Sequence, residues 1–539
     1  MPSIPMTTET FTAEEARALA PYFTNTVHPV FALVNLPETV KGALFARYSR
    51  SAKSLRRLFL DEFLPDFGAS GHAVTAPAPV PAAGVDRADR LYARVFSEYG
   101  DDSVAQLGAA HLACEGVSNI LTKVLEWGRL MAYLEQSTRY VPYTDRPGGH
   151  WKYHVPAELD GSPLRATFVR TLDSAFDAYA RWIPALETHF RARYPKSPED
   201  PEHVYRSVIR AKALDTLRGL LPAATTSNVG LFGTGQAFEA LLLRMFAHPL
   251  LEVRTYATLM LAELRQVIPA FLTRIDQPDR GVRWVEYLSR SRQAFDDAAR
   301  GVLAEPHVDA TDEVTLTDFD PDGELKVVAA ALYAHSALSD RQLLEQVRLL
   351  SSEARTSLLR AYVGQRTNRR HKPGRAFERT SYRFDVLTDY GAFRDLQRHR
   401  LLTIDWQPLS TRHRYMEPAA IEEAGAHVEW RTIMSQSADL YEQLMAAGMR
   451  DVAPYAVPMA YRVRFYMDMN AREAMHVIEL RTSPQGHPAY RRVCQSMHRA
   501  IADVAGHRAI AASMLFADHS EVELERLQSE RAMERKRRN

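Results

Sequence analysis

The chain has 539 residues, with 67 Lys and Arg against 66 Asp and Glu, and its two cysteines are Cys114 and Cys494. This length exceeds what one hydrophobic core usually serves, so two or more domains are expected. The balanced charge argues against a general electrostatic attraction to nucleic acid or to an acidic membrane. Two cysteines cannot build a disulfide framework or a Cys-rich zinc site, and their scarcity favours a reducing compartment.

The chain shows no targeting or membrane signal. Its first residues, "MPSIPMTTETFTAEEARALAPYF", include acids and lack a basic segment followed by an apolar run. No apolar stretch is long enough to cross a bilayer. We therefore expect a cytoplasmic protein that has neither a membrane nor a nucleic acid as its partner.

Local signals predict helices along much of the chain. Thr12 and Glu15 have the spacing of a capping box, and Ser339 and Gln342 repeat that spacing later. Between residues 201 and 221, apolar side chains recur at helical intervals.

Two segments break the helical pattern. Residues 72–86 are rich in Pro and Ala and predict a loop. Residues 304–324 are rich in acids, Pro and Gly, and within them "VTLTDF" predicts the first strand of a second half. The charged tail "ELERLQSERAMERKRRN" predicts a solvated helix that frays into a basic end.

The order of several short motifs occurs twice, which indicates a tandem duplication. "GTGQAFEALLLR" (233–244) aligns without gaps on "NAREAMHVIELR" (470–481), and each segment is followed by His-Pro. Arg-x-x-x-Pro precedes each segment, at Arg218/Pro222 and Arg450/Pro454. We therefore predict two homologous copies, residues 1–303 and 304–539, in an α/β fold in which each copy is a β-sheet with packed helices.

The tripeptide Arg398-His399-Arg400 concentrates cationic side chains. Three adjacent side chains cannot share one helical face, so they must fan out, which suits gripping an extended anion from several sides. Taken alone, the tripeptide is also typical of a surface helix with salt bridges. The 19 histidines show no convincing metal-ligand spacing, so we expect no metal site.

The helix expected at 470–481 carries an amide, two guanidiniums and an imidazole. Asn470 and Arg481 lie near one face, while Arg472 and His476 form a second stripe. The segment "MHVIEL" is apolar for an exposed helix, so we expect a half-buried helix with polar groups aimed into a cleft.

These motifs resemble those of the flavin-dependent thymidylate synthases, whose signature is Arg-His-Arg, seven residues and then Ser. The second copy has Arg398-His399-Arg400 with nine residues before Ser410, and the first copy has Trp127-Gly128-Arg129 with seven residues before Ser137. The family's Asn-Ala-Arg helix resembles 470–481. Its opening Ala-Arg-x-Ser resembles 46–49, and its His-Pro-Glu element resembles "HKPGRAFE", which ends at Glu378.

The resemblance implies reductive methylation of dUMP to dTMP, with FAD as cofactor and with methylenetetrahydrofolate and NADPH as co-substrates. It also implies that no enzyme thiol attacks the uracil, and neither "HLACEG" nor "RRVCQS" forms a motif; both are typical of a helix interior. The family forms tetramers, so a tandem chain is expected to assemble as a homodimer.

The resemblance also assigns roles to individual residues. The catalytic residue is Arg481, which would hold and polarise the pyrimidine. The expected flavin contacts are Arg398, His399, Arg400, Glu378, Asn470, Arg472 and His476. The expected nucleotide contacts are Glu135, Ser137, Arg139, Ser410, Arg412, Arg450 and Arg481.

Each copy departs from the family pattern. The first copy has Gly233 and Gly235 where the helix Asn and Arg stand, and the second has Pro408 where a nucleotide-binding Glu belongs. Because the losses are partly complementary, we hypothesise one composite site. A carboxylate at a pyrimidine N–H and an Arg at its carbonyl would stabilise the charge that develops as C5 attacks.

Two other classes of function remain open at this point. The decayed motifs also fit a non-catalytic paralogue that binds flavin or nucleotide without turnover. A scaffold or nucleic-acid protein that uses the basic tail is a third reading, and the balanced charge disfavours it.

Overall fold

The computed structural model describes residues 9–65, 106–303 and 312–524, together with residues 526, 527, 530, 531 and 535. The predicted loop at 72–86 lies outside the described residues, as does most of the predicted tail helix. Both predicted capping boxes are present, at Thr12 and at Ser339. The described helices include none that is both long enough and apolar enough to span a bilayer.

The chain divides into two compact units that do not coincide with simple halves of the sequence. The first unit comprises Met1–Ala180, Leu221–His307 and Ser435–Val457, and the second comprises Arg181–Leu220, Val308–Met434 and Pro458–Asn539. Each unit therefore contains a segment from the other half of the sequence. The predicted division into copies at 303/304 concerns sequence homology and stays a prediction.

The first unit is built on a four-stranded antiparallel sheet with the order β1-β2-β4-β3. Its strands are β1 (Val30–Ala32), β2 (Ala109–Ser118), β3 (Met131–Glu135) and β4 (Thr226–Thr234). Its helices are α1 (Ala13–Leu19), α2 (Glu38–Tyr48), α3 (Leu55–Leu58), α6 (Asn119–Leu125), α9 (Gly235–Phe246), α10 (Leu251–Leu264) and α11 (Arg283–Val302). Helix α10 packs on β1 and β2.

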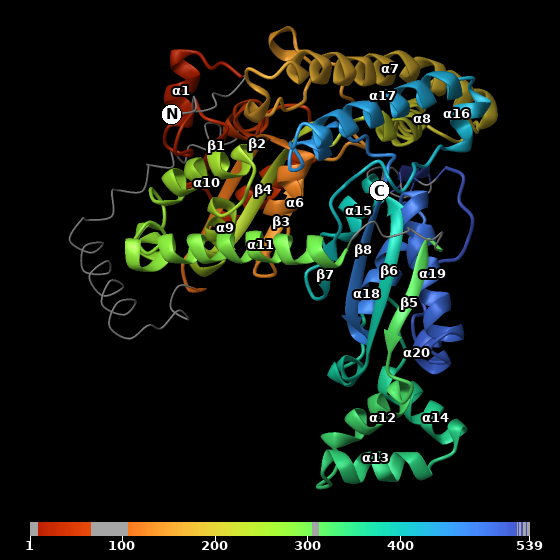
Figure 1. Cartoon of the computed structure of the whole chain (residues 1–539). Coiled ribbons are helices and arrows are strands. Elements are labelled where there is room, and N and C mark those ends of the chain that lie inside the picture. Colours follow the sequence, from red (N-terminus) through yellow and green to blue (C-terminus); the bar gives the residue numbers. More distant parts are fainter. Residues whose placement is uncertain are drawn as a thin grey trace. The chain divides into compact units, whose positions relative to one another are not determined.

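The second unit repeats this topology with the order β5-β6-β8-β7, again antiparallel. Its strands are β5 (Val314–Phe319), β6 (Ser381–Asp389), β7 (Thr403–Trp406) and β8 (Arg462–Asn470), and Figure 1 shows β6 and β8 side by side. Its helices are α8 (Glu202–Leu217), α12 (Gly323–Tyr333), α13 (Asp340–Leu349), α14 (Ser352–Val363), α15 (Tyr390–Leu396), α16 (Ala419–Glu423), α18 (Ala471–Arg481), α19 (Pro488–Asp503) and α20 (Arg508–Ala512). Two long helices, α7 (Leu164–Arg193) and α17 (His427–Ala446), contain unit boundaries.

The predicted α/β fold is confirmed, with an antiparallel sheet in each unit. The strand expected from "VTLTDF" is β5, and the helix expected within 201–221 is α8 followed by a short 3-10 turn. The interpretation of "HLACEG" as a helix interior is wrong: Cys114 lies in strand β2, which pairs with β1 and β4. Four consecutive residues of this strand, Leu112 to Glu115, are buried, and such a run does not distinguish a buried strand from a buried helix. Cys494 does lie inside a helix, α19.

The helix caps define how the two units correspond. Strand β4 ends at Thr234, whose hydroxyl caps α9, and strand β8 ends at Asn470, whose side chain caps α18. Thr234, rather than Gly233, is therefore the counterpart of Asn470. The gap-free alignment of the two helices is off by one residue, because it matches side-chain identities and not the end of the strand.

Candidate functional site

The Arg-His-Arg segment of the second unit follows helix α15. The carboxylate of Asp389 starts that helix by accepting a hydrogen bond of 2.9 Å from the backbone N–H of Ala392. The chain leaves α15 after Leu396 and then places His399 in a buried position, Arg398 in a partly buried one and Arg400 in solvent. The expected fanning of the three side chains is present.

Helix α18 meets this segment through its last residue. The Nε of Arg481 donates a 2.8 Å hydrogen bond to Nε2 of His399, and its Nη1 lies 3.5 Å from a carboxylate oxygen of Asp395. Arg398 pairs with the same carboxylate oxygen at 2.5 Å. Three predicted residues thus form one cluster, which we call the Arg481 cluster, and Asp395 is a fourth member that the sequence motifs did not indicate.

The first turn of α18 gathers a second group of predicted residues. Asn470 caps the helix by accepting from the backbone N–H of Glu473 at 2.9 Å. Arg472 donates to the carbonyl of Pro373 at 3.0 Å and lies 3.6 Å from the carboxylate of Glu378. Glu378 and Arg472, both expected at the flavin, are therefore neighbours.

Three titratable side chains lie behind these arginines. A carboxylate oxygen of Glu473 lies 3.7 Å from Nδ1 of His399, and the rings of His399 and His476 are 5.6 Å apart. Burial raises the pKa of Glu473 to about 7, against the opposing effect of Lys372 and neighbouring arginines. Burial lowers the pKa of His399 and lowers that of His476 to about 4, so both imidazoles are neutral near pH 7.

The remaining second-copy predictions, Ser410 and Arg412, follow strand β7. Ser410 is buried and Arg412 is exposed beside His413, whose pKa burial and nearby arginines lower. Pro408 is exposed. Among the described contacts, none joins Ser410 or Arg412 to the Arg481 cluster.

In the first unit, the Glu135 loop lies against the Ala-Arg-x-Ser element. Glu135 ends strand β3 in a buried position, with its carboxylate 3.7 Å from the ammonium of Lys123. Ser137 donates its backbone N–H to the carbonyl of Ser49 at 3.0 Å, and its hydroxyl accepts from the backbone N–H of Arg139 at 3.3 Å. The structure thus brings together two motifs that are 88 residues apart in the sequence.

The first unit fills the space that an Arg-His side-chain pair would need. A Cβ at Gly128 would lie 2.8 Å from the hydroxyl of Tyr133, and that hydroxyl already donates to the carbonyl of Gly128 at 2.5 Å. Arg244 of α9 lies over the ring of Trp127, with 5.4 Å between guanidinium and ring centroid. A cation–aromatic contact therefore joins helix α9 to the segment of Trp127 in the first unit.

The hypothesis of a composite site joins residues of different units: Glu135, Ser137, Arg139 and Arg450 of the first and Arg481 of the second. It stays a prediction.

The helix caps also revise the Arg-x-x-x-Pro motif. Thr234 follows Pro222 by as many residues as Asn470 follows Pro458, so Pro458 is the counterpart of Pro222. Arg218 then corresponds to Pro454, and Arg450, which is exposed, has no arginine counterpart. The pairing of Arg450 with Arg218 rested on the Arg-x-x-x-Pro pattern alone, and it shifts the second copy by four residues from the register that the helix caps set.

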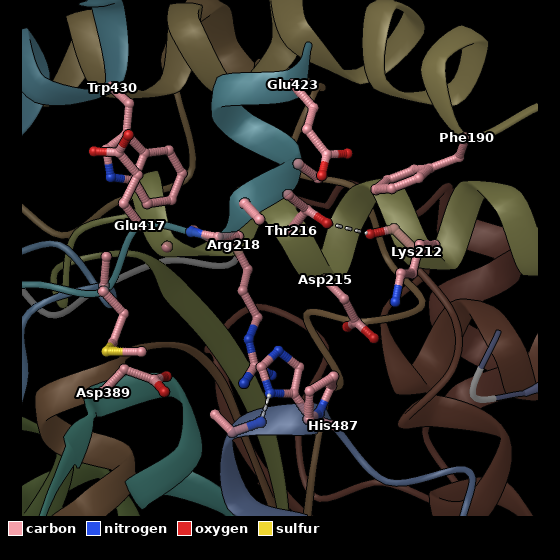
Figure 2. Close-up of a pocket in the computed structure, with 18 of the residues that line it drawn as sticks. Phe190, Lys212, Asp215, Thr216, Arg218, Asp389, Glu417, Glu423, Trp430 and His487 are labelled. Carbon is pink, nitrogen blue, oxygen red and sulfur yellow. Dashed lines mark hydrogen bonds between the residues drawn. The ribbon is translucent and has the colours of Figure 1, made fainter. Parts of the chain in front are cut away.

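Arg218 lies in the second unit, in a cavity of about 320 Å³. Figure 2 shows its side chain running through the cavity toward His487, with Asp389 and Trp430 on other walls. Arg218 is 4% exposed and Trp430 2% exposed, and among the described residues neither Nη2 of Arg218 nor Nε1 of Trp430 has a hydrogen-bond partner. Burial raises the pKa of Asp389 even though Arg218 is close. Two residues that line the cavity therefore each carry a buried donor without a partner among the described residues, an energetic cost that a bound acceptor would remove.

The two thiols are unsuited to nucleophilic attack. Cys114 and Cys494 are both fully buried. Burial raises the pKa of Cys114 far above its usual range and raises the pKa of Cys494 to about 12.

Comparisons with known proteins agree with the doubled topology. The model of the family "thymidylate synthase complementing protein" matches the chain twice, at residues 69–270 and 315–506. The UPF0159 protein of Chlamydia muridarum is 38% identical over 522 residues, covering 96% of this chain and 98% of its own length. The flavin-dependent thymidylate synthase of Clostridium tetani is 25% identical over 184 residues, covering 33% of this chain and 67% of its own.

Among solved structures, the UMP/dUMP methylase PolB from Streptomyces cacaoi bound with 5-Br dUMP aligns with 23% identity and a TM-score of 0.30, covering 38% of this chain and 97% of its own. The two family matches together span most of the chain, one on each side of residue 303. The chain therefore belongs to the thymidylate synthase complementing protein family, as a tandem of two copies.

Proposed function

We propose that this protein methylates dUMP reductively to dTMP, using FAD, methylenetetrahydrofolate and NADPH. The observation that carries the proposal is the partly buried contact between Arg481 and His399, because it joins the two motifs that the resemblance assigns to pyrimidine and flavin. Membership of the family supports the class of reaction. The distant similarity to the Clostridium tetani enzyme supports the use of a flavin.

The residues around α18 fit an anionic cofactor such as FAD. Arg400, Arg472 and Lys372 lie near the carboxylate of Glu473, Arg472 also lies near that of Glu378, and Arg398 pairs with Asp395. The excess of cations favours a pyrophosphate, and forked guanidiniums are suited to its oxygens. The remaining flavin contacts that we assign are Asn470, His476 and His399. FAD, when bound, supplies the carbon and hydride transfer chemistry.

Arg481 is the residue that we assign to the reaction itself. Its guanidinium is held by His399 on one side and Asp395 on the other, so its orientation is fixed before a ligand binds. A fixed cation beside the carbonyl of a pyrimidine stabilises the negative charge that develops as C5 attacks, and it needs no reorganisation at that moment.

The nucleotide contact that the resemblance gave to Arg450 is better served by Arg218. Arg218 holds the first-copy Arg-x-x-x-Pro position, is buried and lines a cavity of the second unit, whereas Arg450 is exposed. We include Arg218 among the nucleotide-binding residues, together with Ser410 and Arg412 of the same unit.

The experiment is an assay of dTMP formation by the purified protein with FAD, NADPH, methylenetetrahydrofolate and dUMP. The absorption spectrum of the purified protein shows whether flavin is bound. The Arg481→Ala variant is expected to lose at least about a hundredfold in turnover, the usual cost of removing one charge-stabilising donor. Arg341→Ala, at an exposed position on α13, is the matched control. Turnover that survives in Arg481→Ala at wild-type level contradicts the assignment.

A second candidate is a paralogue that binds flavin or nucleotide without turnover. Pro408 favours it, because proline stands where the family pattern has a nucleotide-binding glutamate. A yellow protein that binds dUMP and forms no dTMP under these conditions would decide for this second candidate.

A further inference from the structure

Glu473 lies at the centre of the α18 site, and no motif assigns it a role. It is 5% exposed, and its own backbone N–H is held by the cap residue Asn470. Its carboxylate lies 3.7 Å from Nδ1 of His399. At this distance the two groups interact electrostatically without a direct hydrogen bond, and a negative charge beside Nδ1 favours the tautomer with the proton on that nitrogen.

The hydrogen bond at Nε2 of His399 shows which ring nitrogen is unprotonated. Nε2 receives the hydrogen bond from Nε of Arg481, and a guanidinium N–H can only donate. Nε2 must therefore be unprotonated. The neutral ring then carries its proton on Nδ1, the nitrogen that faces Glu473.

A bound metal ion is the competing explanation of this cluster. The donor atoms of His399, Glu473 and His476 all lie within 4.8 Å of one another. Yet Nε2 of His399 accepts from Arg481 and carries no proton, so an ion on Nδ1 would require the ring to be an imidazolate anion. The groups that face Glu473 are moreover cationic: Arg472 on its own helix, Lys372 on the loop before residue 375, and Arg400 on the motif loop. The charge around the donors disfavours a divalent cation.

We propose that Glu473 is a positioning residue: its negative charge, 3.7 Å from Nδ1 of His399, favours the tautomer with the proton on Nδ1 and so keeps Nε2 free to hold Arg481 in the orientation that a pyrimidine carbonyl requires. The role of Arg481 in this inference rests on the proposed function. The coupling of Glu473, His399 and Arg481 rests on the structure alone. A protonated Glu473 lacks the negative charge that favours a proton on Nδ1, and as an O–H donor toward Nδ1 it favours the opposite tautomer. The Nε2–H of that tautomer would oppose the N–H of Arg481.

The first test is the pH dependence of dUMP affinity, measured by calorimetry on the full-length protein with FAD present. Wild-type affinity is expected to fall by about tenfold from pH 8 to pH 6, because one proton competes at a group whose pKa is about 7. Glu473→Gln is expected to remove that slope, whereas Glu473→Asp retains it. Titration of the dUMP phosphate contributes equally to the pH dependence of every variant, so it does not affect the comparison. Glu345→Gln, on the surface of α13, is the control, and its pH dependence of dUMP affinity should match that of wild type. An identical slope in Glu473→Gln and wild type overturns the proposal.

The second test needs no ligand, so it separates this proposal from the proposed function. Folding raises the pKa of Glu473 from 4.5 to about 7, so between these pH values the folded state binds more protons at this group than the unfolded state. The free energy of unfolding therefore falls as the pH rises through that window. Glu473→Gln should therefore gain about 2–4 °C or more in melting temperature over wild type between pH 5 and pH 8. The titrating groups outside this cluster are common to both proteins and cancel in the difference.

The coupling to His399 is read from the same melts. In a His399→Gln background, the pH-dependent gain of Glu473→Gln should become larger, because losing the Nδ1–H that faces the carboxylate raises the pKa of Glu473 further. An unchanged gain shows that Glu473 titrates independently of His399 and overturns the coupling. Stoichiometric Zn²⁺ binding by wild type that is lost in Glu473→Gln also overturns it, in favour of a metal site. Failure to bind dUMP or FAD at any pH contradicts the proposed function, while the melts still decide on the coupling.

Discussion

Arg218 shows how burial sharpens the role of a single side chain. A guanidinium that is 4% exposed has lost its hydration, and its charged neighbour Asp389 is itself buried, which raises the pKa of that carboxyl. A ligand oxygen that accepts from Nη2 would recover the lost interaction. The desolvation penalty of the unpaired donor would be relieved on binding, and this favours a ligand that supplies an acceptor there.

This difference between Arg218 and Arg450 can be measured. Arg218→Ala is expected to weaken dUMP binding by about 10- to 100-fold, the loss of one or two charged hydrogen bonds. Arg450→Ala, at an exposed position, is expected to change the affinity less than about twofold. Calorimetry of both variants, with Arg218→Lys to retain the charge, decides the matter. An equal effect of both alanine substitutions would show that Arg218 has no special role.

At the scale of elements, both units place a helix directly on the end of a sheet strand. Strand β8 passes into α18 at Asn470, and strand β4 passes into α9 at Thr234. The side chain of each cap satisfies an N–H that the first helical turn cannot pair internally. The cap thereby sets which residues of α18 face the Arg-His-Arg segment.

The two caps make a matched pair of variants. Thr234→Ala and Asn470→Ala should each cost about 1 kcal/mol of stability, the usual loss for a side-chain cap. Asn470→Ala should in addition weaken FAD binding, because Asn470 is an assigned flavin contact and Thr234 is not. Thermal melts and flavin fluorescence measure the two effects. Equal FAD affinity in both variants would remove Asn470 from the flavin site.

The limits of the sequence are clearest in these elements. The capping boxes at Thr12 and Ser339 and the strand of "VTLTDF" could be predicted, because their signals are local. The contact of Arg481 with His399 depends on two segments 82 residues apart, and only the resemblance placed them in one site. Glu473 and Asp395 could not be found, because an acid on a helix gives no sign in the sequence of whether it is buried beside a histidine or arginine.

At the scale of the whole molecule, the compact units exchange segments of chain. Residues 435–457, from the second half of the sequence, belong to the first unit. There Ala223 donates to the carbonyl of Val457 at 2.8 Å, and Tyr455 donates its hydroxyl to buried Glu252 at 2.6 Å. Ser118 donates to the same carboxylate through its backbone and its hydroxyl. Simple division of the chain at residue 303 did not anticipate this exchange, since amphipathic helices carry no mark of the core that they join.

Tyr455→Phe tests how much residues 435–457 contribute to the stability of the first unit. Removal of a buried hydroxyl that donates to a carboxylate should cost about 1.5–3 kcal/mol. Ser118→Ala removes one of the donors to the same carboxylate from the first half of the sequence and should cost a similar amount. Calorimetric melts should show both variants destabilising the same transition. If the two variants affect separate transitions, residue 455 does not belong to the first unit's cooperative core.

The exchange has a consequence for how this protein could have arisen and how it can be handled. A gene cut between the two repeats would encode two polypeptides, each missing a piece of its own interior. Neither fragment should be soluble when made alone, whereas production of both in one cell should reconstitute the parent. Deletion of either repeat should therefore also remove part of the core of the unit that remains.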